Sequence, residues 1–391
     1  MSHKTLKNWW TTPKDITADP SKVSTLELFF DIAFTAYFSR LAISYANDFS
    51  LVLIGKFVLL FTLGWWTWYS ISSYHVAYGR EDSRHRIFTF VQMFFLLLMA
   101  VYSPTAFGKT NFLFSLSYFG ILAINSYLWI WTCKRNPENK EALGYTISLL
   151  IALSFIAISL AVPLYARIYL WVASLITSMA SPLLIRICFR KDNAKVNHFI
   201  LSDTLRKRFT RLTFILIGQI IGNIIYGVLN IGIDNSSIYL LLVLGFTIVV
   251  LLYTLYIDFI DNKEIKDKWY VSYIYVVIHL VLSFSICLIG AMYVEYSNIY
   301  TSVISIYPLQ LFSSAIASIC FSIGLFNLIA RTPSSCHSKT LFGILCMISA
   351  VLAIFTAIYS TDLVFTFISG IVVLFIPTIV NFANLFRKNP E

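Results

Sequence analysis

Charged residues are scarce in this chain of 391 residues: Asp, Glu, Lys and Arg together make up 12%, against about 25% in ordinary soluble domains. Apolar residues reach 58%, and a soluble fold with that ratio would expose apolar patches large enough to cause aggregation. The shortage of charge also excludes disordered and coiled-coil classes, because both are rich in polar residues. The composition therefore predicts an all-α polytopic integral membrane protein.

The sequence also lacks the short motifs of the common enzymes. It contains no Walker A string, no His-Glu-x-x-His, no Gly-x-Ser-x-Gly and no dinucleotide-binding fingerprint. Its six cysteines include no Cys-x-x-Cys pair, which indicates neither a zinc site nor a disulfide framework. We therefore predict no cofactor, no metal and no catalytic residue, and an enzymatic activity is the less favoured interpretation.

Long apolar runs are what the chain has in abundance. A helix of about 20 residues crosses a ~30 Å hydrocarbon core, and we find twelve runs of roughly that length. They are 24–46, 51–74, 86–104, 111–133, 142–162, 165–189, 209–231, 237–260, 270–294, 303–330, 339–359 and 362–386. Twelve transmembrane helices are accordingly expected.

The basic residues are distributed unevenly over the predicted connections. All but four of the 29 Lys and Arg fall on one side of the twelve-span arrangement, and the exceptions are Arg40, Lys56, Lys109 and Arg167. Lys and Arg accumulate in short cytoplasmic loops, so both termini are predicted to be cytoplasmic. The net charge of +10 then indicates contact with anionic lipid headgroups rather than with nucleic acid, and the cluster 206–211 is assigned to that role.

A weak internal repeat divides the chain in two. A shift of 187 residues places Trp66–Tyr69 on Tyr253–Tyr256 and Gln92 on His279. Because each half has six spans and starts inside, the halves are predicted to be parallel repeats about an axis along the membrane normal. The expected segments are a cytoplasmic N-terminal segment (1–23), a first six-helix repeat (24–189), a basic cytoplasmic linker (190–208), a second six-helix repeat (209–386) and a cytoplasmic C-terminus (387–391).

Two acids in the first span are the strongest candidates for function. Glu27 and Asp31 are four residues apart, so they share one helix face, and Asp31 would lie about 10 Å deep in the membrane. Placing an ionised carboxylate inside the membrane costs free energy. Two carboxylates close together favour uptake of a proton or coordination of a cation. The alternative is structural: each acid pairs with a Lys or Arg of a neighbouring helix, or caps the helix start.

Four further polar residues lie inside predicted spans. His279 falls near the midplane, Gln92 occupies the repeat-related place, and Gln219 lies at a similar depth in the seventh span. Imidazole relays protons near neutral pH, and the amides could supply neutral ligands, although polar residues also hold helices together. Asp258 is the last candidate, with the alternative that it only ends its helix at the interface.

These residues carry a resemblance to a known family. The string Glu27-Leu-Phe-Phe-Asp31 with Phe34, the aromatic run Trp65-Trp66-x-Trp68, then Arg86, Gln92, the stretch 253–258 and His279 resemble the low temperature requirement protein A (LtrA) family. The resemblance implies a multi-span protein of the bacterial cytoplasmic (inner) membrane associated with growth in the cold, without a settled reaction. Gln219 departs from the pattern, since the family often has a glutamate there, which marks a divergent member.

Three classes of function fit this sequence. The favoured one is passage of an ion (proton or cation) or small solute between the two helical halves, with Glu27, Asp31, His279, Gln92, Gln219 and Asp258 along the pathway. The second is an intramembrane lipid-modifying enzyme, and the third is a membrane sensor or scaffold without transport. A homo-oligomer is compatible with each of them.

Overall fold

The structure of the chain is a computed structural model that is entirely helical in its regular elements. It describes residues 25–45, 50–79, 83–188, 201–231, 237–261, 263–266, 268–299, 306–331, 336–360 and 362–388. Within these ranges there are twelve α-helices and no strand, although Ile265 and Ala330 form an isolated antiparallel bridge. The expected N-terminal segment 1–23 and residues 190–200 of the expected linker lie outside the described residues.

The described chain divides into two compact units. Unit 1 comprises the described residues of 1–41 and 55–211, and unit 2 those of 42–54 and 212–391. Unit 1 contains most of α2 (Thr25–Tyr45) and α3 (Leu51–Tyr78), then α4 (Ser83–Tyr102), η2 (Ser103–Thr105), α5 (Asn111–Arg135), α6 (Lys140–Ala161), α7 (Leu164–Cys188) and the start of α8 (Asp203–Ile231). Unit 2 contains the rest of α8, then α9 (Ser237–Tyr256), η4 (Ile257–Asp261), α10 (Trp269–Ile299), α11 (Ile306–Ile329), α12 (Cys336–Tyr359) and α13 (Leu363–Lys388).

Nine of these helices are long and apolar enough to cross a membrane, counted over the described residues. They are α3, α4, α5, α6, α8, α9, α10, α11 and α12. Among the other three, α2 carries Glu27, Asp31 and Arg40 within 21 residues, and these charges lower its hydropathy. In α13 only Leu363–Ile379 qualifies, as a shorter apolar helix. The twelve expected helices are therefore present, while the exact number of spans and the internal repeat stay predictions.

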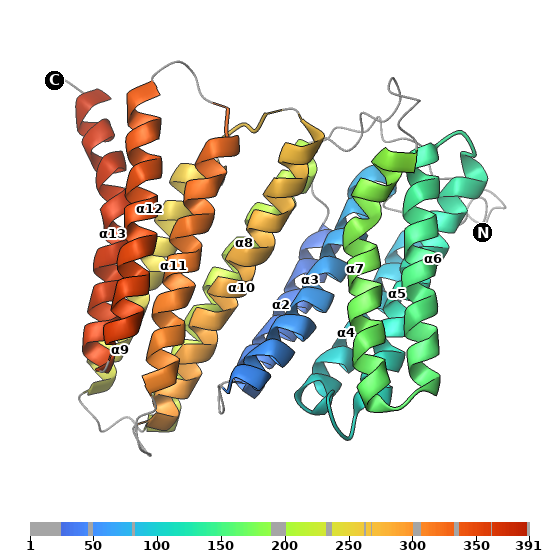
Figure 1. Ribbon diagram of the computed structural model, residues 1–391, viewed down its shortest axis with the longest axis horizontal. Coiled ribbons are helices and arrows are strands. Elements are labelled where there is room, and N and C mark those ends of the chain that lie inside the picture. Colours follow the sequence, from blue (N-terminus) through green and yellow to red (C-terminus); the bar gives the residue numbers. More distant parts are fainter. Residues whose placement is uncertain are drawn as a thin grey trace, which may run out of the picture. The chain divides into compact units, whose positions relative to one another are not determined.

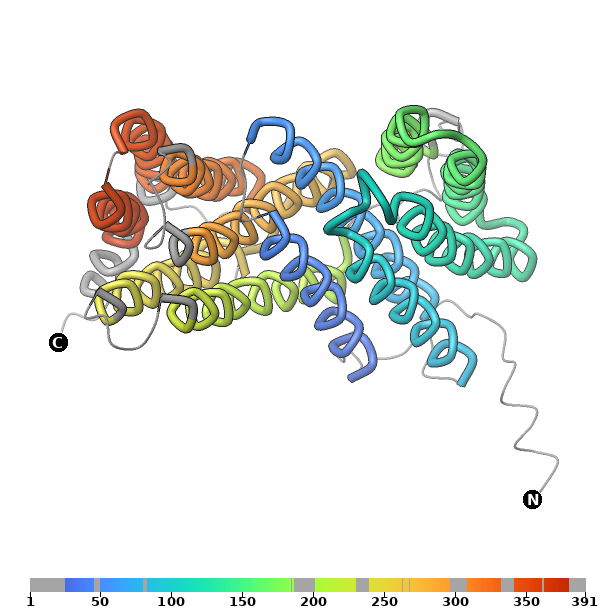
Figure 2. Tube along the Cα trace, turned by 90° about the horizontal axis from the view of Figure 1, so that it is seen from below, coloured from blue at the N-terminus to red at the C-terminus, as the bar shows by residue number. Residues whose placement is uncertain are grey.

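Successive helices pack against one another in each unit. In unit 1, α4 packs on α5, α5 on α6 and α6 on α7 (Figure 1). In unit 2, α10 packs on α11, α11 on α12 and α12 on α13, and α13 returns to α9 (Figure 2). Short connections favour this antiparallel order, because they leave little chain to reach past a neighbour.

A buried arginine links the ends of α6 and α7. Arg167 donates from Nε to the Ser159 carbonyl at 2.7 Å and from Nη2 to the Val162 carbonyl at 2.9 Å. It also donates to the side chain of Asn111, on α5. The last carbonyls of a helix have no partner within the helix, so this side chain satisfies the end of α6. Arg167 was expected on the outer side or in the membrane, and it is 5% exposed.

The outward-facing side chains of both units are largely apolar. Exposed residues on α4 and α6 include Phe94, Val101 and Ile158, and those on α12 include Val351 and Ile358, each more than half exposed. Patches of this kind are unfavourable in water, whereas hydrocarbon accepts them without cost. The surface therefore fits a lipid bilayer.

Candidate functional site

The centre of the site is Asp31, on the inward face of α2. Its neighbours along that face are Phe30, Phe34, Tyr37 and Phe38, all at most 1% exposed. This set recurs at three- and four-residue spacing, which defines one side of a helix. Asp31 is itself 0% exposed, so its carboxylate has left the solvent and needs partners inside the protein.

Arg208 supplies the opposite charge. Its Nη2 donates to Asp31 Oδ1 at 2.6 Å, and both side chains are 0% exposed. Trp68 of α3 donates a second hydrogen bond, from Nε1 to the same oxygen at 2.8 Å. Hydrogen bonds with an ionised partner are short and strong, and the arrangement joins α2, α3 and the start of α8 within unit 1.

A second carboxylate shares the same arginine. Glu27 lies one turn before Asp31, and its Oε1 is 4.0 Å from Arg208 Nη1, with the Glu27 side chain 12% exposed. We refer to Glu27, Asp31 and Arg208 as the charge cluster. With all three ionised, it holds two negative charges against one positive charge. The excess negative charge favours uptake of a proton or a cation.

Three polar atoms of the charge cluster retain bonding capacity. Asp31 Oδ2 and Arg208 Nε and Nη1 are buried and have no hydrogen-bond partner among the described residues. Aromatic rings close the site around them: the Arg208 Cζ atom lies 5.8 Å from the Phe30 centroid and 6.0 Å from the Trp68 centroid. Such rings stabilise the guanidinium through cation–π contacts, and Asp31 Oδ2 stays buried without a described hydrogen-bond partner.

Among the predicted site residues, the structure brings together only Glu27 and Asp31. Gln92 lies on α4 in the same unit, 1% exposed, and neither atom of its amide has a hydrogen-bond partner among the described residues. His75 of α3 meets His85 of α4, and Gln92 is two turns, about 10 Å, further along α4. It therefore lies near the depth of Trp68, but no described contact joins it to the charge cluster.

His279 lies in unit 2 and is fully engaged by its neighbours. Its Nδ1 is 2.9 Å from the Tyr275 carbonyl, its Nε2 is 3.1 Å from Tyr256 Oη, and the Tyr275 ring stacks on it at 4.1 Å. A carbonyl can only accept, so Nδ1 carries a hydrogen and, in the neutral ring, Nε2 accepts from the tyrosine. This bonding fits a histidine that links α9 to α10.

The other two candidates also belong to unit 2. The amide atoms of Gln219, on α8, are buried without a hydrogen-bond partner among the described residues. Asp258 is half-buried in η4, the π-helical turn that ends α9. The hydrogen bonds described for His279 go to Tyr256 and Tyr275, and the expected pathway through all six residues stays a prediction.

Unit 1 contains further buried polar groups between α3 and the helices α5 and α6, where Asn139 caps the start of α6. The cross-helix hydrogen bonds follow residues 70, 74 and 78, one face of α3: Asn125 Nδ2 donates to Ser70 Oγ at 2.9 Å, Tyr74 Oη and Thr132 Oγ1 share a bond of 3.3 Å, and Asn139 Nδ2 donates to Tyr78 Oη at 2.7 Å. Asn125 Oδ1, Ser126 Oγ and Trp129 Nε1 lie buried there without a described partner. The interior of unit 1 is thus polar along the last third of α3.

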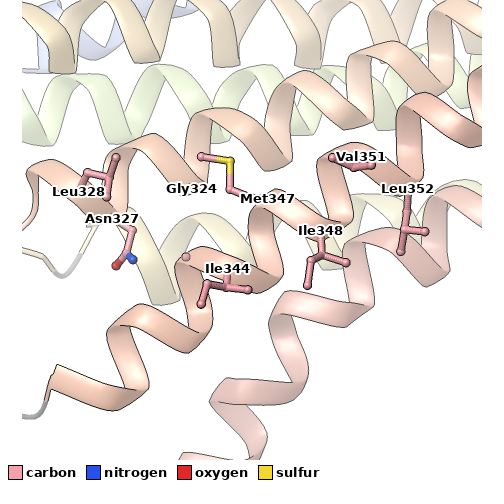
Figure 3. Close-up of a pocket in the computed structure, with 9 residues that line it drawn as sticks. Gly324, Asn327, Leu328, Ile344, Met347, Ile348, Val351 and Leu352 are labelled. Carbon is pink, nitrogen blue, oxygen red and sulfur yellow. The ribbon is translucent and has the colours of Figure 1, made fainter.

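A groove of about 600 Å³ lies apart from these residues, between α11 and α12 (Figure 3). Its lining is apolar except for the Asn327 amide, and it includes Leu328, Ile344, Met347 and Val351. None of the predicted site residues lines it. The groove offers no charged group for chemistry.

Sequence reasoning missed Arg208. We grouped it with the cluster 206–211 at the lipid headgroups, but its 0% exposure removes it from them. A signal was present: α8 starts at Asp203, and Leu205, Phe209 and Leu212 repeat at helical spacing around Arg208 on one apolar face. Extending the predicted helix by two turns would have placed this arginine inward.

Apolar helices of spanning length, an apolar surface and a buried ion pair define a multi-span α-helical membrane protein. The chain belongs to the bacterial low temperature requirement A protein (LtrA) family, whose sequence model matches residues 22–378. An uncharacterized protein of Rhizobium meliloti (strain 1021) is 28% identical over 167 residues, which cover 42% of this chain and 41% of that protein. No solved structure matches.

Proposed function

We propose that this LtrA family member passes protons across the membrane, with the charge cluster of unit 1 as the exchange site. One observation carries the proposal: two carboxylates of α2 share a single buried arginine, and Asp31 Oδ2 has no described partner. A proton on Asp31 or Glu27 would cancel the excess negative charge, and its release would restore the Arg208 pair. Charges inside a membrane-spanning bundle commonly mark ion pathways and proton relays.

The test uses the purified full chain in liposomes with a pH-sensitive dye inside and an imposed potassium diffusion potential. The wild type should change the internal pH faster than protein-free liposomes. Asp31→Asn should reduce the flux to the protein-free rate, since an amide of the same shape cannot alternate between a neutral and a charged form as a carboxyl group does. Glu27→Gln should lower the flux less, because Arg208 still holds Asp31.

Asp203→Asn is the matched control. Asp203 is an exposed acid on α8 that pairs with Arg206 of the same helix, so its loss should leave the flux unchanged. Absence of wild-type flux, or full flux in Asp31→Asn, would exclude the proposal. Turnover of bilayer lipid without flux would instead favour the lipid-modifying enzyme.

The family description adds a physiological readout. We propose that this chain supports growth at low temperature through ion balance, as the name of its family suggests. In a strain lacking the protein, wild type and Asp203→Asn should restore growth in the cold, and Asp31→Asn made at equal membrane abundance should not.

A further inference from the structure

A pair of histidines lies beside the charge cluster in unit 1. His75, in the last turn of α3, and His85, in the first turn of α4, have ring centroids 4.4 Å apart with an interplanar angle of 73°. His75 is 2% exposed, and neither ring nitrogen has a hydrogen-bond partner among the described residues. A buried imidazole ordinarily has its nitrogens bonded, as His279 does in unit 2.

One aromatic ring separates His75 from the charge cluster. The Phe30 centroid lies 5.5 Å from the His75 ring and 5.8 Å from the Arg208 Cζ atom. The titratable and charged groups that the described contacts place near His75 are Tyr74 on α3, with 6.3 Å between the ring centroids, His85 on α4 and, across Phe30, Arg208 on α8 with the two carboxylates that it holds. Arg84 is held on the ring of Trp131, 4.3 Å from its centroid. His85 is half-buried, so of the two histidines it is the one nearer to solvent.

We propose that His85 and His75 form a relay that carries protons between solvent at the end of α3 and α4 and the charge cluster. An imidazole can take a proton on one nitrogen and release the proton of its other nitrogen. A proton taken up by one nitrogen of His85 would free the proton of its other nitrogen for His75. Because the Phe30 ring has no exchangeable proton, a water molecule beside it would carry the proton released by His75 to the carboxylates, so that the number of protons is conserved. A protonated His75 would also offset the second negative charge of the cluster.

The relay deepens the proposed function but is measurable without flux. In bilayers containing protein labelled with ¹⁵N-histidine, solid-state NMR can follow the exchange of ring protons with solvent. His75 should exchange rapidly in the wild type, and His85→Phe, which keeps a ring but removes both nitrogens, should slow that exchange by roughly the 10²–10⁴-fold that a proton-transferring side chain contributes. His279, whose nitrogens are both engaged, serves as the slow internal control.

The outcomes separate the two proposals. Slow exchange of His75 in the wild type, or exchange unaffected by His85→Phe, would overturn the relay even if the liposomes show proton flux. Exchange that depends on His85 without any flux would sustain the relay and exclude proton passage. Where His85→Phe lowers the yield, His85→Gln keeps a polar side chain without a titrating ring and should give the same slowing.

Discussion

The Asp31 carboxylate is buried away from solvent. The stability of unit 1 therefore depends on the opposite charge and the hydrogen-bond donors that surround it. Burying an ion is expensive, and the attraction within an ion pair often only offsets the cost. Arg208 and Trp68 together donate two hydrogen bonds to Asp31 Oδ1. Removing the charge of Arg208 alone should therefore lower the stability of the protein more than replacing both Asp31 and Arg208 with uncharged side chains.

Loss of Arg208 alone should have a measurable cost in stability. Arg208→Gln should lower the free energy of unfolding by about 3–5 kcal/mol, the usual cost of leaving one buried charge without its partner. The double variant Asp31→Asn/Arg208→Gln should recover a large part of that loss because the two fully buried charges are gone and only Glu27, whose side chain is 12% exposed, keeps its charge. Tryptophan fluorescence during heating in detergent would report on it, since Trp65, Trp66 and Trp68 lie in unit 1.

Measuring both stability and proton flux in the double variant distinguishes a proton pathway from an ion pair that only stabilises the fold. If the ion pair is only structural, the double variant should be both stable and active in liposomes. If the cluster exchanges protons, the double variant should be stable and inactive. A double variant less stable than Arg208→Gln alone would show that the unpaired Asp31 carboxylate is not what destabilises the single variant.

At this scale the sequence predicted part of the site. Asp31 and Glu27 could be found because acids at four-residue spacing inside an apolar run are rare and share a face. Arg208 could not be separated from its basic neighbours by composition, because headgroups and buried carboxylates attract the same side chain. His279 was predicted from its depth, its repeat relation to Gln92 and the chemistry of imidazole, and none of these reveals that its two ring nitrogens are already bonded.

Among the helices, α3 shows how a small residue permits close packing in unit 1. Gly64 faces α2, and a Cβ atom built there would collide with the Tyr37 ring, whose Cδ1 would lie only 3.0 Å away. Tyr37 Oη donates to the Leu60 carbonyl of α3 at 2.8 Å, which fixes the ring against the helix. Gly55, on the same helix, has no neighbour within 4 Å of such an atom among the described residues.

The two glycines therefore form a matched pair. Gly64→Ala should destabilise the protein by about 1–3 kcal/mol, the usual cost of overpacking, because the tyrosine ring cannot move without losing its hydrogen bond. Gly55→Ala should be neutral or stabilising by up to about 1 kcal/mol, since alanine loses less backbone entropy in a helix. Thermal unfolding in one detergent would compare them, and equal effects would show that α2 and α3 are not in close contact here.

The predicted helices agree with the structure where apolar runs decide them, and less well at their ends. The run 209–231 missed the first two turns of α8 because Arg206, Lys207 and Arg208 look like a loop in a hydropathy profile. In the structure two of the three are at least partly accessible while Arg208 points inward, which is an amphipathic helix start rather than a linker. Apolarity alone cannot locate such a start.

For the whole molecule, the orientation in the membrane is still a prediction from the basic residues. Reporter fusions after residues 140, 195 and 268 should report the cytoplasm, and fusions after 234 and 295 should report the outside. Positions 195 and 234 lie outside the described residues. One fusion with the opposite result would exclude the twelve-span arrangement with both termini inside.

The hydrogen bond from Trp68 to Asp31 has an optical consequence. Indole emission responds to charges near the ring, and here the Nε1–H group donates directly to the carboxylate at 2.8 Å. Protonation of Asp31 should therefore shift the Trp68 emission, and Asp31→Asn should fix it at one wavelength at every pH. A chain in which Trp68 is the remaining tryptophan would carry its own fluorescent indicator for the charge state of the site.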